Sequence, residues 1–175
     1  MSLAGVVLGR AEPSRARSVL VQGSDAARIT LEVEFGLRTR AAAIAFDPLT
    51  TPPGELLTGV AESSGAATCR EDDCFGLRWV TLSGGDPDDL PISIGVIAES
   101  VEQAGCAEQL VCAVFAFERG VYLIYSFARA AFHVFVPHSA GRDIEQEQRL
   151  QEAMAPDLRL EPDPQRWYPL WGMPL

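Results

Sequence analysis

Residues 110–136 read LVCAVFAFERGVYLIYSFARAAFHVFV, and this stretch decides the fold class. Segments 110–117 and 121–127 are rich in β-branched and aromatic residues, which favour strands. The short connection between them ends in Gly120, which suits the positive φ that a tight hairpin needs. Residues 131–136 add a third strand of similar composition. We therefore predict an antiparallel meander at the centre of a sheet.

The chain before the meander predicts a helix followed by strands. Residues 24–35 are ambiguous, because their apolar positions alternate as in a strand, whereas Ser24 as N-cap and Gly36 just beyond the end bracket a helix. We favour the helix. Strands are then expected at residues 37–46, 66–70 and 76–82, the last two forming a hairpin through an acidic turn.

Two further helices are expected, one before and one after the meander in the sequence. Asp86 as N-cap and Pro87 at the first helical position begin a helix that runs to about Ala104. Its apolar residues recur every three or four positions, so one face should lie on the sheet. The last helix spans residues 144–154 and begins after Asp143. Its predicted solvent-facing side carries Glu145, Glu147, Arg149 and Glu152.

The order of these elements, α-β-β-β-α-β-β-β-α, predicts an α+β fold in which helices cover one antiparallel sheet. It resembles the order in type III secretion chaperones and in YbjN-like proteins. This resemblance implies a fold and no function. A length of 175 residues fits one domain. We place this domain at residues 24–175, after a mobile N-terminal arm at residues 1–23.

Charge argues against two classes of partner. The net charge is −10 and the pI is about 4.6, so the chain repels nucleic-acid phosphates and anionic lipid surfaces. All 14 cationic residues are arginine, which removes lysine Schiff-base chemistry. No apolar run approaches the roughly 20 residues of a membrane-spanning helix. Because the start of the chain also lacks a basic leader, we expect a cytoplasmic protein.

Residues 166–175 read RWYPLWGMPL and carry the candidate binding residues. Each large ring removes roughly 150–250 Å² of surface from water when it is covered, so these rings require a protein surface. The prolines restrict the segment, which favours packing against its own sheet. The alternative is contact with a partner or a second copy, since arginine and aromatic residues dominate binding energy at interfaces. The candidate partner-binding residues are Arg166, Trp167, Tyr168 and Trp171.

The four cysteines are a weak match to a metal site. Four residues separate Cys69 from Cys74, and five separate Cys106 from Cys112. Cys112 lies within the apolar meander, where a free thiol packs as a small hydrophobic group. We expect reduced cysteines, with a labile disulfide between Cys69 and Cys74 left open. No metal and no cofactor is predicted.

The best catalytic set in the sequence combines His133, His138, Asp143 and Cys112 as nucleophile and bases. His133 shares a strand face with Phe135, whereas His138 lies beyond Pro137 in a loop, so the pattern does not bring the two imidazoles together. A histidine on a strand is more often packed than catalytic. We therefore predict no catalytic residue and no enzymatic activity.

Short motifs spread over nearly the whole chain carry a family resemblance. They are residues 7–10, 29–32, 36–38, 121–125 and 166–172, together with Phe46, Pro48, Glu71, Asp72, Phe75, Gly76, Trp79, Phe132, Phe135, Pro137, Arg142, Asp143, Leu160, Glu161 and Asp163. The most specific is the closing segment, with two tryptophans, a tyrosine and a proline in a fixed order. Together they resemble the PspA-associated protein PspAB family of bacteria and archaea.

The chain departs from the PspAB pattern in three places. Residues 38–42 replace a Pro-Thr-Gly turn after the first helix, and a helix common in the family is shortened around residues 54–63. Residues 128–130, Ala-Arg-Ala, replace a basic Lys-Arg-Gly in the meander. A partner surface built from that helix or those cations is therefore in question here.

The resemblance implies a non-enzymatic accessory or regulatory role, through protein binding, in the PspA phage-shock response to envelope stress. PspA is the first partner implied and an HtpX-like membrane protease the second, and a homodimer stays open. Two alternative functions also stay open. One is a secretion-chaperone-like module that holds an extended peptide at a sheet edge. The other is a thiol- or metal-dependent enzyme built on Cys112.

Overall fold

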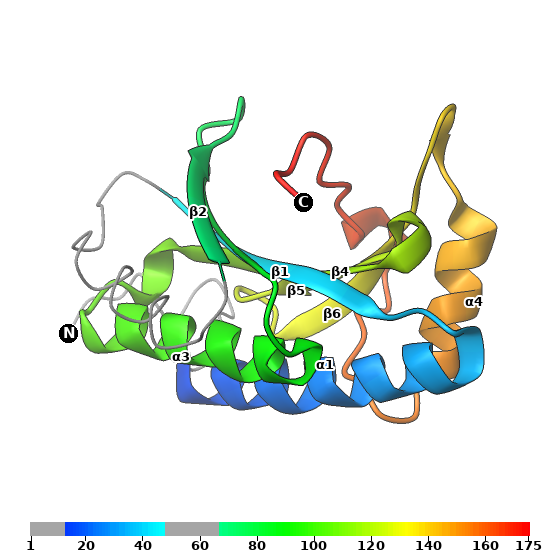
Figure 1. The fold of residues 1–175 in the computed structure, drawn as a ribbon, viewed down its shortest axis with the longest axis horizontal. Helices are drawn as coiled ribbons and strands as arrows, with labels where there is room; N and C mark the ends of the chain where they lie inside the picture. Colours follow the sequence, from blue (N-terminus) through cyan, green and yellow to red (C-terminus); the bar gives the residue numbers. More distant parts are fainter. Residues whose placement is uncertain (1–12, 48–66) are drawn as a thin grey trace.

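The computed structural model describes residues 13–47 and 67–175, and it confirms the α+β class, with helices packed on a six-stranded antiparallel sheet (Figure 1). The helices are α1 (Pro13–Phe35), α3 (Leu90–Gln103) and α4 (Ile144–Met154). The strands of the sheet are β1 (Thr39–Phe46), β2 (Ala67–Asp72), β3 (Arg78–Ser83), β4 (Leu110–Phe117), β5 (Tyr122–Ser126) and β6 (Ala131–Phe135). A small ribbon of β7 (Pro137–His138) and β8 (Gly141–Arg142) leads into α4.

The strands lie in the order β2-β3-β1-β4-β5-β6, and every neighbouring pair is antiparallel. The predicted hairpin β2–β3 and the meander β4–β5–β6 are both present. Our placement of the meander at the centre of the sheet is wrong, because β1 inserts between the hairpin and the meander. Residues 42–46 of β1 are buried without interruption, as expected for a strand that is paired on both edges and covered on both faces.

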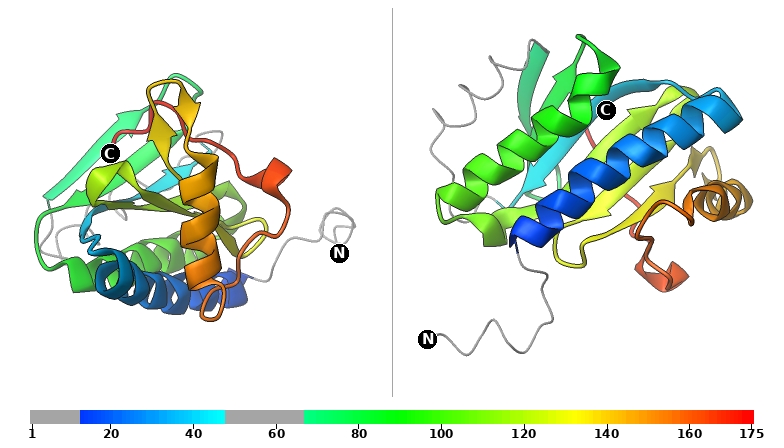
Figure 2. Two further views of the ribbon diagram at one scale, coloured as in Figure 1. Left: turned by 90° about the vertical axis from the view of Figure 1, so that its right-hand side faces the viewer. Right: turned by 90° about the horizontal axis from the view of Figure 1, so that it is seen from below.

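The two faces of the sheet are covered by different kinds of structure. Helices α1 and α3 lie side by side on one face (Figure 2), where Arg17 pairs with Glu99 at 3.0 Å and Arg28 pairs with Asp88 at 2.8 Å. The end of the chain, drawn in red, lies over the opposite face (Figure 1), where Leu170, Met173 and Leu175 pack. Helix α4 packs beside β6 at the edge of the sheet.

Each face of the sheet has its own apolar cluster. The larger cluster lies between the sheet and the helices and includes the fully buried Leu20, Ile94 and Phe132. The smaller lies on the opposite face and consists of Ala43, Ala45, Trp79, Cys112, Val114, Ile124 and Phe135. The alternation predicted along β6 is confirmed, since Phe132 and Val134 belong to the larger cluster and Phe135 to the smaller.

Helix α1 is longer at its start than the sequence predicted, because it begins at Pro13. The mobile arm predicted at residues 1–23 is therefore wrong from Pro13 onwards, and the residues before Pro13 lie outside the described part of the chain. Ser24 is not an N-cap, since its hydroxyl donates to the carbonyl oxygen of Leu20 at 2.7 Å within the helix. Burial of Leu20 explains the extension, because packing stabilises helices more than local propensity does. Gly36 ends the helix as predicted, with a φ of +63°.

The remaining helix starts and turns follow the predicted chemistry. Asp86 caps the short 3₁₀ turn Pro87–Asp89, which leads into α3. The β4–β5 hairpin turns through Arg119 and Gly120, whose φ angles are +60° and +69°. Asp143 caps α4 through its side chain. These local signals place the helix starts and the hairpin without reference to the rest of the fold.

Gly23 is expected to be intolerant of a side chain. A Cβ there would lie 2.5 Å from Cε2 of Phe132, whose ring is fully buried. Gly23→Ala should lower the free energy of unfolding by about 1 kcal/mol, because overpacking, at roughly 1–3 kcal/mol, outweighs the roughly 1 kcal/mol that alanine gains in a helix. Urea denaturation measures the change. The control Gln22→Ala, at an exposed neighbouring position, should alter stability by less than about 0.5 kcal/mol, and equal losses would contradict the close approach.

Candidate functional site

The outer edge of β6 is covered by side chains of α4. Gln151 accepts a hydrogen bond from the amide of Val134 at 3.0 Å, and Glu147 accepts one from the amide of Val136 at 2.9 Å. The chain after α4 adds one parallel bridge to β6. Because these amides are paired, this edge of the sheet is closed to pairing with another strand.

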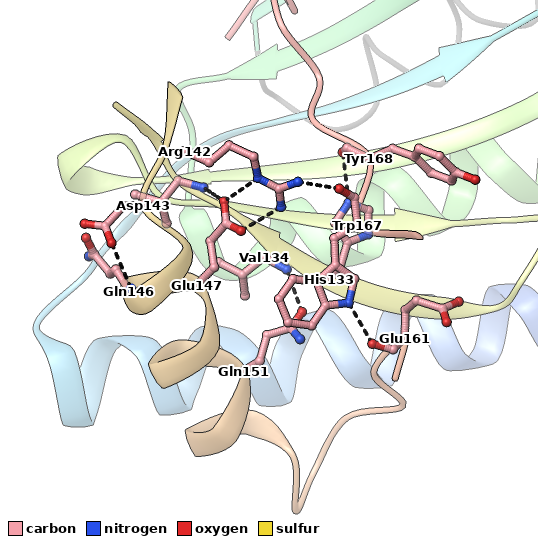
Figure 3. Close-up of polar contacts among 11 residues, drawn as sticks. His133, Val134, Arg142, Asp143, Gln146, Glu147, Gln151, Glu161, Trp167 and Tyr168 are labelled. Atoms are coloured by element: carbon pink, nitrogen blue, oxygen red, sulfur yellow. Dashed lines mark hydrogen bonds and ion pairs between the residues drawn. The ribbon is translucent and has the colours of Figure 1, made fainter. Parts of the chain in front are cut away.

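A buried ion pair lies at the end of this edge (Figure 3). Glu147 is fully buried, which corrects its predicted place on the solvent-facing side of α4. The guanidinium of Arg142 donates to Oε1 of Glu147 at 3.0 Å and to Oε2 at 2.6 Å. The reason for the correction is that three N–H donors, two from Arg142 and one from Val136, offset the loss of water around the carboxylate.

The start of the C-terminal segment is fastened to the domain by three polar contacts (Figure 3). Nη1 of Arg142 donates to the carbonyl oxygen of Trp167 at 2.6 Å. The indole Nε1 of Trp167 donates to the carbonyl oxygen of Glu161 at 2.8 Å, and the side chain is buried. Nε2 of His133 lies 3.1 Å from the carbonyl oxygen of Tyr168. The segment therefore packs on its own domain, as we favoured.

His133 is buried on β6, on the same face as Phe135, as the strand pattern predicted. A carbonyl oxygen can only accept, so Nε2 carries the proton in the hydrogen bond to Tyr168. Burial lowers the pKa of the imidazole to about 4, and the positive charge of Arg142 acts in the same direction. His133 is therefore neutral near pH 7 and serves as a donor to the backbone of the tail.

The last residues of the chain cover the smaller apolar cluster. Leu170, Met173 and Leu175 pack against it. The ring of Trp171 meets Phe135 edge-on, with the ring centroids 5.0 Å apart. The amide of Leu175 donates to the carbonyl oxygen of Met173 at 3.0 Å, a backbone hydrogen bond inside the tail that does not join it to the sheet. Apolar contact therefore makes the main contribution to holding this end of the chain.

A groove of about 180 Å³ opens between the C-terminal tail and the turn of the β2–β3 hairpin, and we call it the tail–hairpin groove. Phe75 is 72% exposed and Trp171 is 44% exposed, whereas Trp79 is buried. The residues that line the groove include Asp73, Phe75 and Trp79 from the hairpin and Leu170, Trp171 and Met173 from the tail. Two segments that are distant in the sequence thus form one surface.

The four binding residues predicted from the sequence do not form one surface. Trp167 is buried against the domain. Arg166 is half exposed and pairs with Asp163 at 3.2 Å. Tyr168 is 56% exposed but does not line the tail–hairpin groove. Of the four, Trp171 is the residue that the fold places in that groove.

The hairpin residues of the groove were missed as binding candidates. Phe75 and Trp79 were noted in the sequence only as part of the family resemblance. A local signal existed, because an aromatic residue in a turn, such as Phe75, has no strand or helix face on which to be buried. No pattern in the sequence joined that turn to Trp171, because only the tertiary fold places both at one groove.

The catalytic set considered from the sequence is not assembled. Cys112 is buried, and burial raises the pKa of its thiol to about 12. Strand β5 lies between Cys112 on β4 and His133 on β6. His138 is exposed on β7, and Asp143 caps α4. Within this set of four residues, the geometry therefore places no activated thiol next to a base.

Metal-binding clusters and membrane-spanning helices are two features that the described residues lack. Across residues 13–47 and 67–175, no group of three or more His, Cys, Asp or Glu side chains is placed to hold a metal ion. In the same part of the chain, no helix has both the length and the apolar character needed to cross a membrane. Cys74 is an exposed free thiol, so no disulfide joins it in this structure.

Comparison with known protein families matches residues 1–175, the whole chain, to PspA associated protein B. The chain belongs to this family. The comparison with curated proteins found no match, and neither did the comparison with solved structures. The likeness of this PspAB protein to type III secretion chaperones and YbjN-like proteins therefore stays a prediction.

Motifs that resembled PspAB in the sequence meet in space around the tail. Arg142 from one motif donates a hydrogen bond to the carbonyl of Trp167 from another. The indole of Trp167 in turn donates to the carbonyl of Glu161 from a third. One departure from the PspAB pattern also has a structural meaning. The φ of Ala130 is +49°, in the region that glycine favours, which fits the glycine that the family resemblance leads us to expect at this position.

Arg142→Met should destabilise the protein strongly. The change removes the cation, leaves the carboxylate of Glu147 buried without its ion-pair partner, and frees the carbonyl of Trp167. Breaking a buried pair in this way costs about 3–5 kcal/mol, which guanidinium denaturation would measure. Arg149→Met, at an exposed arginine of α4, is the matched control and should cost less than about 1 kcal/mol. If Arg142→Met lowers the free energy of unfolding no more than Arg149→Met does, the ion pair makes no special contribution to stability.

Stability should depend on pH through His133. The folded protein keeps this imidazole neutral down to about pH 4, whereas the unfolded chain takes up a proton near pH 6.5. Stability therefore falls as the pH drops from 6.5 towards 4, by at most about 1.4 kcal/mol per pH unit from this group. Comparing wild type with His133→Gln in urea at several pH values isolates the effect, because the other groups titrate in both. His138→Gln is the control, and equal slopes for wild type and His133→Gln would refute the assignment.

Proposed function

We propose that this PspAB protein is a non-enzymatic binding protein that acts with PspA in the cytoplasmic part of the envelope-stress response. The observation that carries the proposal is the family match over residues 1–175, because the name of the family denotes association with PspA. The protein would act through contacts with its partner and not through a reaction.

Exposed aromatic side chains support a binding role. Phe75, Tyr168 and Trp171 are 72%, 56% and 44% exposed, although the chain has apolar clusters that other rings enter. Rings of this size dominate the binding energy of protein interfaces when a partner covers them. The tail thus serves two purposes, since Trp167 packs inside the domain and Trp171 is presented at its surface.

The placement of the reactive side chains supports a role without catalysis. The thiol of Cys112 is buried in the smaller cluster, and the imidazole of His133 is engaged with the backbone of Tyr168. An HtpX-like membrane protease and a second copy of this chain are further partners that the family resemblance suggests. Neither is needed for the central proposal, which concerns PspA.

Purified protein and purified PspA should form a complex. We expect co-elution in size-exclusion chromatography with light scattering, and a Kd on the order of micromolar by calorimetry. An unrelated acidic protein of similar net charge is the control for simple charge attraction. Absence of a complex at tens of micromolar, with both proteins folded, would refute the proposal.

The same light-scattering measurement on the chain alone reports whether it forms a homodimer. Point variants at exposed rings are better probes of binding than a truncation after Asp163. The truncation removes Trp167, whose buried indole donates to the carbonyl of Glu161, so it would destabilise the domain as well as remove the tail.

A further inference from the structure

The tail–hairpin groove combines aromatic rings with a carboxylate. Phe75, Trp79 and Trp171 supply three rings from two separate segments, and Asp73 supplies the carboxylate. The faces of aromatic rings carry partial negative charge, so they attract cations, and a nearby carboxylate adds to the attraction. A groove with this lining is therefore suited to a positively charged side chain.

The carboxylate of Asp73 is fixed in place and ionised. Oδ1 accepts from the amides of Phe75 and Leu77, each at 2.9 Å, and Oδ2 accepts from the indole Nε1 of Trp79 at 2.8 Å. Partial burial raises the pKa of this carboxyl, but the hydrogen bonds from the Trp79 side chain and from the backbone of Leu77, Phe75 and Gly76 outweigh it and lower the pKa overall. Oδ2 accepts this one bond from the indole, and a carboxylate oxygen can accept two, so it can take a further donor from a ligand.

Charge around the groove also favours a cation. None of the residues that line it is basic, and the protein carries a net charge of −10. Arg78 in the same hairpin is paired with Asp72 at 2.8 Å, and Arg142 near Phe135 is paired with Glu147. These two cations are thus neutralised by their own partners, and the carboxylate of Asp73 adds negative charge to the groove.

We propose that the tail–hairpin groove binds an arginine side chain of a partner protein, with the guanidinium between the rings of Phe75 and Trp171 and within reach of Asp73. Arginine fits because its planar guanidinium stacks on rings and donates to a carboxylate at the same time. Apolar residues beside that arginine would meet Leu170 and Met173. This inference rests on the proposed protein-binding function and names the chemistry that the surface recognises.

The test uses two synthetic peptides, acetyl-Leu-Arg-Leu-amide and its citrulline counterpart, which has the same shape without the charge. Binding to the full chain would be followed through the indole N–H signals in ¹H–¹⁵N NMR. We expect the arginine peptide to bind about tenfold more tightly than the citrulline peptide, and to weaken at high salt. Equal binding of the two peptides, or no binding of either at millimolar concentration, would overturn the proposal.

Variants locate the site. Phe75→Ala and Trp171→Leu should each weaken the arginine peptide by about fivefold, since each removes one ring face. Tyr168→Ala is the matched control, because it removes an exposed ring of the same tail that does not line the groove, and it should leave binding unchanged. Denaturation curves confirm that each variant is folded. An effect of Tyr168→Ala as large as that of the groove variants would overturn the proposal.

The outcome can be separated from that of the proposed function. If PspA binds wild type, Phe75→Ala and Trp171→Leu equally well, the association with PspA stands and the groove proposal fails. If the arginine peptide binds as expected but purified PspA does not, the groove proposal stands and the association with PspA fails.

Discussion

The buried carboxylate of Glu147 is the group on which the carboxyl-terminal half of this structure depends. It accepts hydrogen bonds from Arg142 and from the amide of Val136, so it joins α4 to β8 and to the edge of β6. Through the same guanidinium it reaches the backbone of the tail at Trp167. A buried charge without its partners is costly, so these four elements are held in one arrangement.

This constraint explains how, among residues 13–47 and 67–175, one face of the sheet is covered by the tail and not by a helix. On the other face, α1 and α3 bury the larger cluster in the usual manner of two-layer α+β folds. On the tail side, the small side chains of Ala43 and Ala45 leave room above the sheet, and the C-terminal tail packs there. The tail is fastened by hydrogen bonds at its start and by apolar contact at its end.

A covering segment of this kind leaves a groove with exposed rings, and our binding proposals rest on that groove. A helix would have closed this face with its own side chains, whereas the tail meets the β2–β3 turn at a groove with exposed rings. Membership of the PspA associated protein B family and this groove point in the same direction, towards contacts with another protein. The interior of the domain, where Cys112 and His133 lie, serves packing and the fastening of the tail.

Much of the fold follows from local patterns. The capping aspartates at 86 and 143, the turn at Gly120 and the alternation along β6 act over a few neighbouring residues, so their structural outcome is already contained in the sequence. The start of α1 was misplaced because Ser24 has the chemistry of a cap, while the burial of Leu20 that extends the helix is a tertiary effect. The position of β1 within the sheet likewise depends on pairing between distant segments.

By itself, the sequence determined the α+β class, most helix starts and strand identities, and the fact that the aromatic tail needs a covering surface. Only the tertiary structure decided that Glu147 is buried, that Trp167 belongs to the interior, and that Trp171 shares a groove with Phe75. The physical reason is the separation along the chain between the groups that interact. Backbone propensity and capping are settled within a few residues, whereas the burial of a charge and the placing of two rings at one groove depend on which distant groups the folded chain brings together.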